Sequence, residues 1–219
     1  MDREIDMKEV SDGKLYGLRD MVRADCGGCE GCCECCRGMG SSIVLDPYDI
    51  YHLTTGLNRS FEDLLKEEKI ELNLAEGIVL PNLKMAGQME QCGFLNEDGR
   101  CDIHPFRPGM CRIFPMGRYY ENGGFQYFLQ VHECKKEPKT KIKVQKWIDT
   151  PNPKQNEAFI TEWHYFLKAL SKRIEHTEEG GFRKSLSMYL LKSFYVKPYE
   201  KAVDFYEQFE ERLAEAKKL

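Results

Sequence analysis

The feature that most constrains the fold of this chain is a crowded run of cysteines. Six of the ten cysteines in the 219 residues lie within residues 26–36. A chain of this length can bury an apolar core, so it does not need several disulfides to stay folded. Cysteines that cluster in a sequence without forming disulfides bind metal or take part in chemistry. The run therefore predicts a metal site.

The rest of the sequence indicates a reducing compartment. Residues 1–6 carry neither the basic nor the apolar segment of a secretory signal, and no apolar run reaches about 18 residues. We therefore expect a cytoplasmic protein with no membrane partner. The net charge of −4 argues against a nucleic-acid partner, which a basic surface would attract. The predicted partner is a protein or small molecule of unknown identity.

Two spacings can be read within the cysteine run. The first is C-x2-C-x2-C-x3-C from Cys26, which matches the bacterial ferredoxin run but has Arg37 where that run has proline. The second is C-x2-C-x2-C-C from Cys29. Two-cluster ferredoxins carry a second run of the first kind, and the later cysteines of this sequence are widely separated instead. We therefore favour the second spacing.

Further motifs follow the run in a fixed order. They are C-x-F-L from Cys92, C-x-I-H from Cys101 and R-P-x2-C-R-x-F-P from Arg107. Together with C-x2-C-x2-C-C they give the chain, over roughly residues 26–134, a sequence that resembles the CxxCxxCC family of zinc- or iron-chelating domains, also called YkgJ-like cysteine cluster proteins. The resemblance implies metal or iron–sulfur binding with no single reaction attached. One distant relative with a known activity is the flagellin lysine N-methylase.

The predicted metal ligands are the eight cysteines that fit this pattern. They are Cys29, Cys32, Cys35, Cys36, Cys92, Cys101, Cys111 and Cys134. Cys26 and Cys33 lie outside it. The eight could fill two four-thiolate sites, or one cluster and a second, partly ligated site. Adjacent side chains of an extended segment point to opposite sides, so Cys35 and Cys36 either face two centres or need a special turn to share one.

The residues around these cysteines suggest which group they hold. Structural zinc sites commonly use a second C-x2-C pair, which is missing, so an iron–sulfur cluster is the predicted cofactor and zinc the alternative. Arg107 and Arg112 are the predicted cofactor-binding residues, because cations near thiolates lower their pKa values and offset their charge. His104 and His132 are close enough in sequence to serve as ligands or as hydrogen-bond donors to ligands.

The predicted fold class is α+β, a small metal-stapled core of short helices and β-hairpins with an appended helical segment. We expect an extension over residues 1–25, the cysteine-cluster domain over 26–134, a lysine-rich linker over 135–153 and a helical segment over 154–219. Helices are predicted after Asp46 and Ser60, over residues 156–174 and 185–196, and from Pro198 onward. Hairpins are predicted within residues 70–85, 94–103 and 119–131.

Three functions are compatible with these features. The first is a metal-cluster protein for electron transfer, cluster handling or metal storage, which needs only the cysteines. The second is a cluster-dependent enzyme resembling a protein methyltransferase, with the C-terminal helices shaping a pocket. The third is a zinc-binding structural or interaction module in which Lys135–Lys146 would contact an anion. The sequence supplies no independent catalytic motif, so whether the protein is an enzyme stays open.

Overall fold

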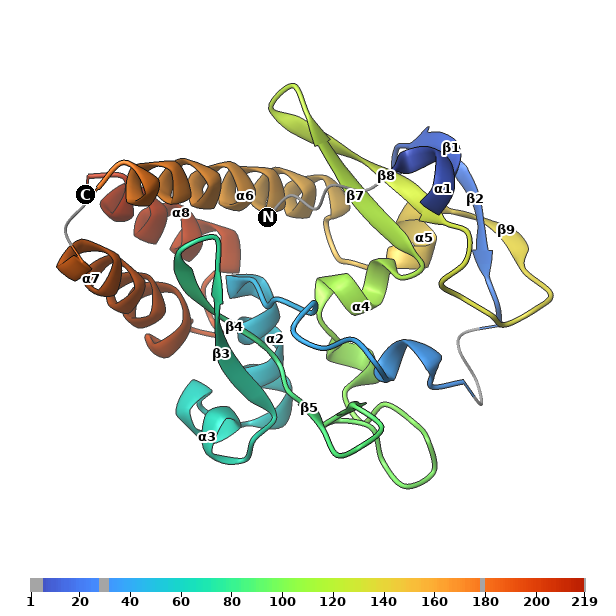
Figure 1. Ribbon diagram of the computed structural model, residues 1–219, viewed down its shortest axis with the longest axis horizontal. Coiled ribbons are helices and arrows are strands. Elements are labelled where there is room, and N and C mark those ends of the chain that lie inside the picture. Colours follow the sequence, from blue (N-terminus) through green and yellow to red (C-terminus); the bar gives the residue numbers. More distant parts are fainter. Residues whose placement is uncertain (1–5, 28–31, 178–179, 219) are drawn as a thin grey trace.

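Helices and short antiparallel strand pairs make up the protein, which confirms the α+β prediction (Figure 1). The computed structural model describes residues 6–27, 32–177 and 180–218. The helical elements are α1 (Met7–Val10), η1 (Glu34–Cys36), α2 (Pro47–Leu57), α3 (Phe61–Lys66), η2 (His104–Phe106), α4 (Gly109–Ile113), α5 (Val144–Ile148), α6 (Pro153–Glu175), α7 (Gly180–Leu190), η3 (Leu191–Val196) and α8 (Phe205–Ala216).

The strands form one three-stranded sheet and three pairs. They are β1 (Ser11–Tyr16), β2 (Met21–Asp25), β3 (Ile70–Ala75), β4 (Ile78–Leu83), β5 (Met85–Ala86), β6 (Gln91–Cys92), β7 (Met116–Glu121), β8 (Gly124–Gln130) and β9 (Thr140–Lys143). The sheet has the order β1-β8-β7, and the pairs are β2-β9, β3-β4 and β5-β6. The hairpins predicted within residues 70–85 and 119–131 are therefore confirmed.

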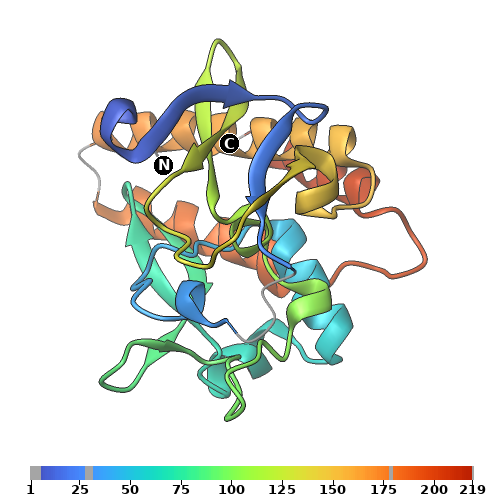
Figure 2. The ribbon, with the colours of Figure 1, turned by 90° about the vertical axis from the view of Figure 1, so that its right-hand side faces the viewer.

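The N-terminal residues pair with strands far along the chain (Figure 2). Ser11 lies opposite Gln130 in the sheet, and Asp25 lies opposite Thr140 in the β2-β9 pair. Residues 140–148, which were predicted to belong to a linker, thus form β9 and α5. Strand β2 and this segment flank one small core, because Val22 and Trp147 are buried in the same cluster.

Local capping explains where α2 and α3 begin. Asp46 and Asp49 form a reciprocal capping box at the start of α2, and Ser60 and Asp63 do the same for α3. Both predicted starts are confirmed. Helix α2 ends at Asn58 in the left-handed conformation.

Gly56 lies inside α2, one residue before the helix ends. The Phe106 ring lies against it, so that a Cβ at position 56 would approach the ring to 2.8 Å. The glycine thereby lets η2 pack closely on α2.

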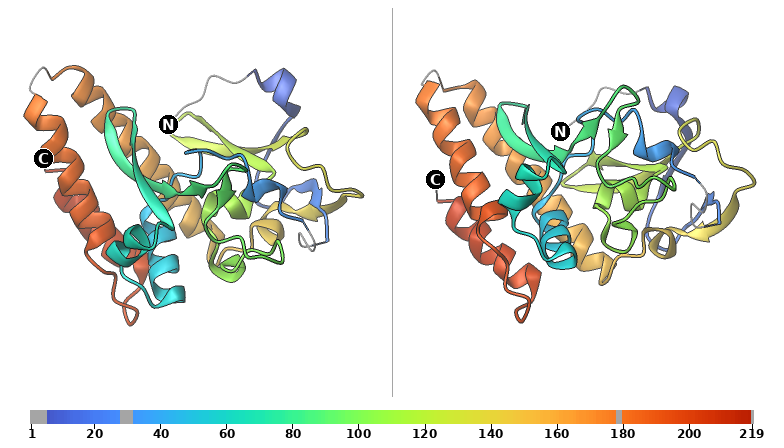
Figure 3. Two further views of the ribbon diagram at one scale, coloured as in Figure 1. Left: turned by 60° about the horizontal axis from the view of Figure 1, so that its bottom comes forward. Right: turned by 90° about the horizontal axis from the view of Figure 1, so that it is seen from below.

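The C-terminal helices share the larger hydrophobic core with the N-terminal half of the protein (Figure 3). Phe159 and Trp163 of α6, and Phe209 of α8, are buried in the same cluster as Leu53 of α2 and Leu80 of β4. The predicted C-terminal helices are thus present, and α2 and the β3-β4 hairpin complete their core. Their aromatic side chains make up packing surface, as helical spacing indicates.

Two predicted elements differ in extent from the structure. The last helix begins at Phe205 instead of Pro198, because the Asp204 side chain accepts hydrogen bonds from Tyr206 N and Glu207 N and caps it there. The hairpin predicted within residues 94–103 is reduced to a single bridge between Leu95 and Cys101.

No helix within the described ranges is long and apolar enough to cross a membrane.

Candidate metal centre

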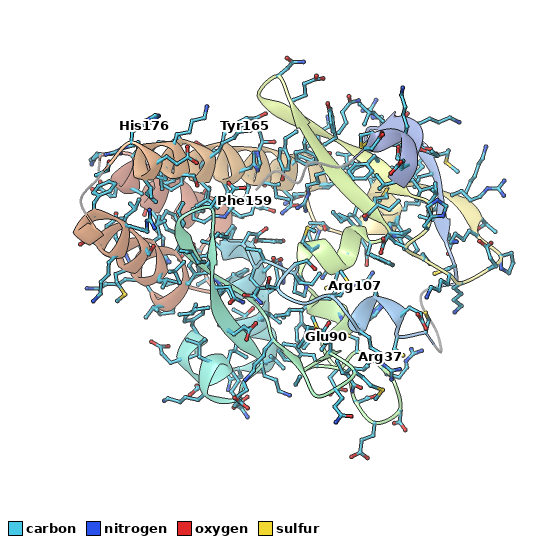
Figure 4. All side chains as sticks on the ribbon, viewed as in Figure 1. Arg37, Glu90, Arg107, Phe159, Tyr165 and His176 are labelled. Atoms are coloured by element: carbon cyan, nitrogen blue, oxygen red, sulfur yellow. The ribbon has the colours of Figure 1, made fainter. Side chains whose placement is uncertain are left out.

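Six cysteines line one cavity of about 80 Å³ below α4. They come from η1 and the residue stretch before it, from β6, from the Leu95–Cys101 bridge and from α4. Figure 4 places Arg107, which also lines the cavity, near Arg37 and far from His176 on α6. The six are Cys32, Cys35, Cys36, Cys92, Cys101 and Cys111.

The backbone around η1 brings the first thiols toward β6. The Cys36 N–H donates to the Cys33 carbonyl at 2.9 Å, which forms the tight 3-10 turn. Arg37 then bridges to Gln91, and the Gly38 N–H donates to the Glu90 carbonyl at 3.0 Å. Cys35 and Cys36 therefore share one cavity with Cys92, through the special turn that neighbouring cysteines were expected to need.

The later thiols are held by short local turns. The Asn96 side chain accepts from the Arg100 N–H at 2.8 Å and closes the loop before Cys101. The Asp102 N–H donates to the Phe94 carbonyl at 2.9 Å, which ties the Cys101 segment to the Cys92 segment. Cys111 lies on the five-residue helix α4. Short turns and one short helix thus bring together thiols that are far apart in the sequence.

Cys35 and Cys36 are coupled by a hydrogen bond between their thiols. As acceptor, Cys35 has its pKa lowered to about 7, chiefly by this bond and further by the charge of Arg107. As donor, Cys36 has its pKa raised by the same bond, by burial and by nearby thiols. Of the two sulfurs, Cys35 is therefore the readier to become a thiolate near neutral pH.

Burial is the main cause of raised pKa values at the other cavity thiols. It raises the pKa of Cys92, of Cys101 and, most strongly, of Cys111. Backbone N–H groups oppose the shift at two of them, since Phe94 donates to Cys92 and Ile103 donates to Cys101. In both cases the donor is the backbone N–H two residues after the cysteine. Such a hydrogen bond stabilises the thiolate form of the sulfur, which is the form that binds metal.

Arg107 is the cation most closely associated with the thiols. Its charge favours the thiolate forms of Cys35 and Cys101. One guanidinium nitrogen lies 3.0 Å from His104 Nε2. Its Nε is buried and has no hydrogen-bond partner among the described residues. An unpaired buried donor beside the cavity fits a bound group with negative charge.

Arg112 has a different position from the one the sequence predicted for it. It does not line the cysteine cavity. Its guanidinium donates to the carbonyls of Arg107 at 3.0 Å, Asp149 at 3.1 Å and Pro105 at 2.7 Å. Arg112 therefore braces the backbone that carries Arg107 and is a positioning residue.

The remaining predicted ligands lie apart from these six or are not described. Cys29 lies outside the described residues. Cys134 follows β8 and does not line the cavity. His104 lines the cavity, whereas His132 is exposed and does not. The structure thus brings together six of the eight predicted cysteines.

The cysteine sulfurs that line the cavity are the type of ligand that a thiophilic metal prefers. Thiolates select zinc and iron–sulfur clusters over hard cations such as magnesium. Within the described ranges, no three Cys, His, Asp or Glu side chains already stand in the geometry of a metal site. The six thiols nevertheless line one cavity.

The apolar part of the cavity wall was not recognised in the sequence. Ile43, Leu83, Met85 and Ile103 line the cavity with the cysteines. An apolar wall lowers the local dielectric and limits the access of water to a bound group. No periodic pattern marks these residues as cavity-lining, because they come from unconnected segments.

Asp49 connects α2 to the helix that carries Cys111. It is 4% exposed, and its Oδ1 accepts from the Gly109 N–H at 2.7 Å while Oδ2 accepts from the Asp46 N–H at 3.1 Å. Burial, and then the charge of Asp46, raises the pKa of Asp49 to about 8. Asp49 thus both caps α2 and braces the start of α4.

We expect Asp49→Ala to lower the free energy of unfolding by about 2–4 kcal/mol. The substitution leaves the half-buried Gly109 N–H without its Asp49 partner and removes half of a capping box. Denaturant unfolding measures the loss. Asp63→Ala is the matched control, because Asp63 holds the same capping position in α3 without the bond to a distant segment. Equal losses in the two variants would contradict the bracing role.

Comparison with known proteins agrees with this geometry. Residues 25–148 match the CxxCxxCC family, described as "Putative zinc- or iron-chelating domain". No curated protein and no solved structure matches the chain. The match covers more than half of the 219 residues and includes all ten cysteines. The chain belongs to the CxxCxxCC family and is a metal-binding cysteine cluster protein.

Proposed function

We propose that the cavity holds an iron–sulfur cluster, which the protein uses for redox or cluster-supported chemistry. The observation that carries this proposal is the size of the space that the thiols surround. A single water needs roughly 10–15 Å³ of such volume, and the cavity has about 80 Å³. A cluster of several iron and sulfide atoms uses this space better than one metal ion in direct contact with four sulfurs.

The proposed cluster takes three thiolates from Cys92, Cys101 and Cys111, and the fourth from the Cys35–Cys36 pair. Four cysteines are the usual ligand set of such clusters, and their spacing in the sequence can be irregular. Arg107 offsets the negative charge of the thiolates from the cavity wall. The apolar wall and the hydrogen bonds to Cys92 and Cys101 are features that tune the reduction potential of a cluster.

A cytoplasmic location belongs to the same proposal. Thiol ligands stay reduced in the cytoplasm, where they can receive a metal or cluster. The division into a cysteine-cluster domain and a helical segment also stays a prediction, with residues 26–134 carrying the ligands and residues 154–219 supporting them.

Iron, sulfide and zinc analysis of protein purified without oxygen tests the proposed cluster. We expect brown protein with iron and acid-labile sulfide in equal amounts, and near-complete loss of both in Cys92→Ser. Cys33→Ser is the matched control, because Cys33 is next to Cys32 but does not line the cavity. Colourless protein with zinc in place of iron would contradict the cluster and favour a zinc-binding structural or interaction module.

A further inference from the structure

A second group of cysteines lies beside the cavity and shares one member with its wall. It consists of Cys26, Cys32 and Cys134. Cys26 directly follows β2 and is 6% exposed, and Cys134 lies between β8 and β9. Neither of these two lines the cavity, whereas Cys32 does. Cys32 thus lies between the two groups of thiols.

Strand pairing brings the chain segments of this group together. Asp25, the residue before Cys26, lies opposite Thr140 in the β2-β9 pair. From there, the Lys139 ammonium group donates to the Cys134 carbonyl at 2.6 Å and folds the intervening loop back. Cys26 and Cys134 therefore lie at the same end of this strand pair.

The segment around Cys32 joins the same place. Lys135, next to Cys134, forms an ion pair of 3.7 Å with Glu34. The thiols of Cys26 and Cys32 are both close enough to Cys134 to contribute, after burial, to its raised pKa. Three thiols from three separate segments thus lie near one another, although among the described residues they do not yet stand in the geometry of a bound metal.

Cys134 has the same local hydrogen bond as two thiols of the cavity. The Lys136 N–H donates to the Cys134 sulfur, as Phe94 does for Cys92 and Ile103 does for Cys101. In each case the donor lies two residues after the cysteine. Lys139, whose side chain is only 13% exposed, adds a positive charge beside Cys134. A backbone donor and a nearby cation both stabilise a thiolate ligand.

We propose that Cys26, Cys32 and Cys134 form a second centre, which binds a single thiophilic ion of the zinc class. Three thiolates are one short of the four that an iron–sulfur cluster usually takes. Zinc accepts three protein ligands and leaves the fourth tetrahedral position to another ligand. Cys29 lies outside the described residues, and no part in the centre is assigned to it.

The second centre has a structural consequence of its own. It ties β2, the stretch before η1 and the loop before β9 into one unit, beside the core that contains Val22 and Trp147. The centre differs from the cavity in its ligands, so it does not depend on which metal the cavity holds. It also gives a role to Cys26, which the family pattern leaves out.

Metal analysis of cysteine variants tests the second centre. Each protein is purified without oxygen, incubated with Zn²⁺, desalted and analysed for zinc, iron and sulfide. We expect Cys26→Ser and Cys134→Ser each to bind one zinc ion fewer than the unmodified protein while they keep its iron and visible spectrum. Cys111→Ser should lose the metal of the cavity and keep the zinc of the second centre. Cys33→Ser should keep both.

The outcomes separate this proposal from that of the cluster. If the cavity holds zinc instead of iron, the two groups of variants should still each lose a different zinc ion. Cys134 is less buried than Cys26, so its variant keeps the test valid if Cys26→Ser does not fold. Full zinc binding by Cys134→Ser, or loss of the cavity metal together with the zinc, would overturn the second centre.

Discussion

Removal of the bound metal is expected to open the cysteine-bearing segments while the C-terminal helices stay folded. Structural zinc sites in small domains contribute roughly 10–16 kcal/mol, which is as large as the stability of a typical whole protein. The segments that carry the cavity thiols have little else to hold them. Helix α4 has five residues, η1 has three and the β5-β6 pair has two residues in each strand.

Amide hydrogen exchange before and after chelation measures this effect. Residues 32–37 and 91–113 should lose most of their protection, whereas α6 and α8 should keep theirs, because aromatic packing and not the metal holds these helices. Addition of metal back to the chelated protein is the control and should restore protection. If the helices lost protection before the cysteine segments, the metal would not be the main support of those segments.

The second large effect is expected from Phe209→Ala, which should lower the free energy of unfolding by about 3–5 kcal/mol. Phe209 is 1% exposed and lies at the centre of an aromatic cluster. Its ring centroid is 4.6 Å from that of Phe159, 6.0 Å from that of Trp163 and 5.9 Å from that of Phe194. Truncation leaves a cavity among side chains of three elements, which cannot all move inward.

Denaturant unfolding of Phe209→Ala, with metal analysis of the folded variant, checks this prediction. Met188→Ala is the control, because it truncates a side chain that is 59% exposed and should change stability little. The metal content of Phe209→Ala should match that of the unmodified protein, since Phe209 does not line the cavity. A stability loss no larger than that of Met188→Ala would contradict the central place of Phe209 in the core.

Elements that depend on local signals could be predicted from the sequence. The starts of α2 and α3 follow from Asp46 with Pro47 and from Ser60 with Asp63, which satisfy backbone groups only three residues away. Helix α6 follows from apolar residues at helical spacing, and extends a few residues beyond the predicted range. The turn residues 122–124 likewise indicate the β7-β8 hairpin.

Elements that depend on distant partners could not be predicted. Strand β1 has no clear alternation of polar and apolar residues, and β2 has only five residues, so both depend on β8 and β9 for their hydrogen-bond partners. For the same reason β9 was predicted to be part of a linker. Segments with many lysines resemble solvated loops until a partner strand is known.

The sequence could predict which residue types form the candidate site. It could not predict which cysteines lie together in the cavity and which lie elsewhere. Spacing predicts that Cys35 and Cys92 belong to a metal site, and the structure brings them to one cavity. Spacing alone cannot show that Cys134 lies beside Cys26, because that depends on the pairing of β2 with β9. The brace from Arg112 to the Arg107 carbonyl is equally invisible in the sequence.

The distribution of the cavity thiols over separate segments also sets an order of events during protein synthesis. Cys32, Cys35 and Cys36 leave the ribosome well before Cys92, Cys101 and Cys111, so the nascent chain presents the first thiols while the wall opposite them does not yet exist. Insertion of the inorganic group must therefore wait until α4 has emerged. In that interval the early thiols face the solution and are open to oxidants or to scavenging by other metals.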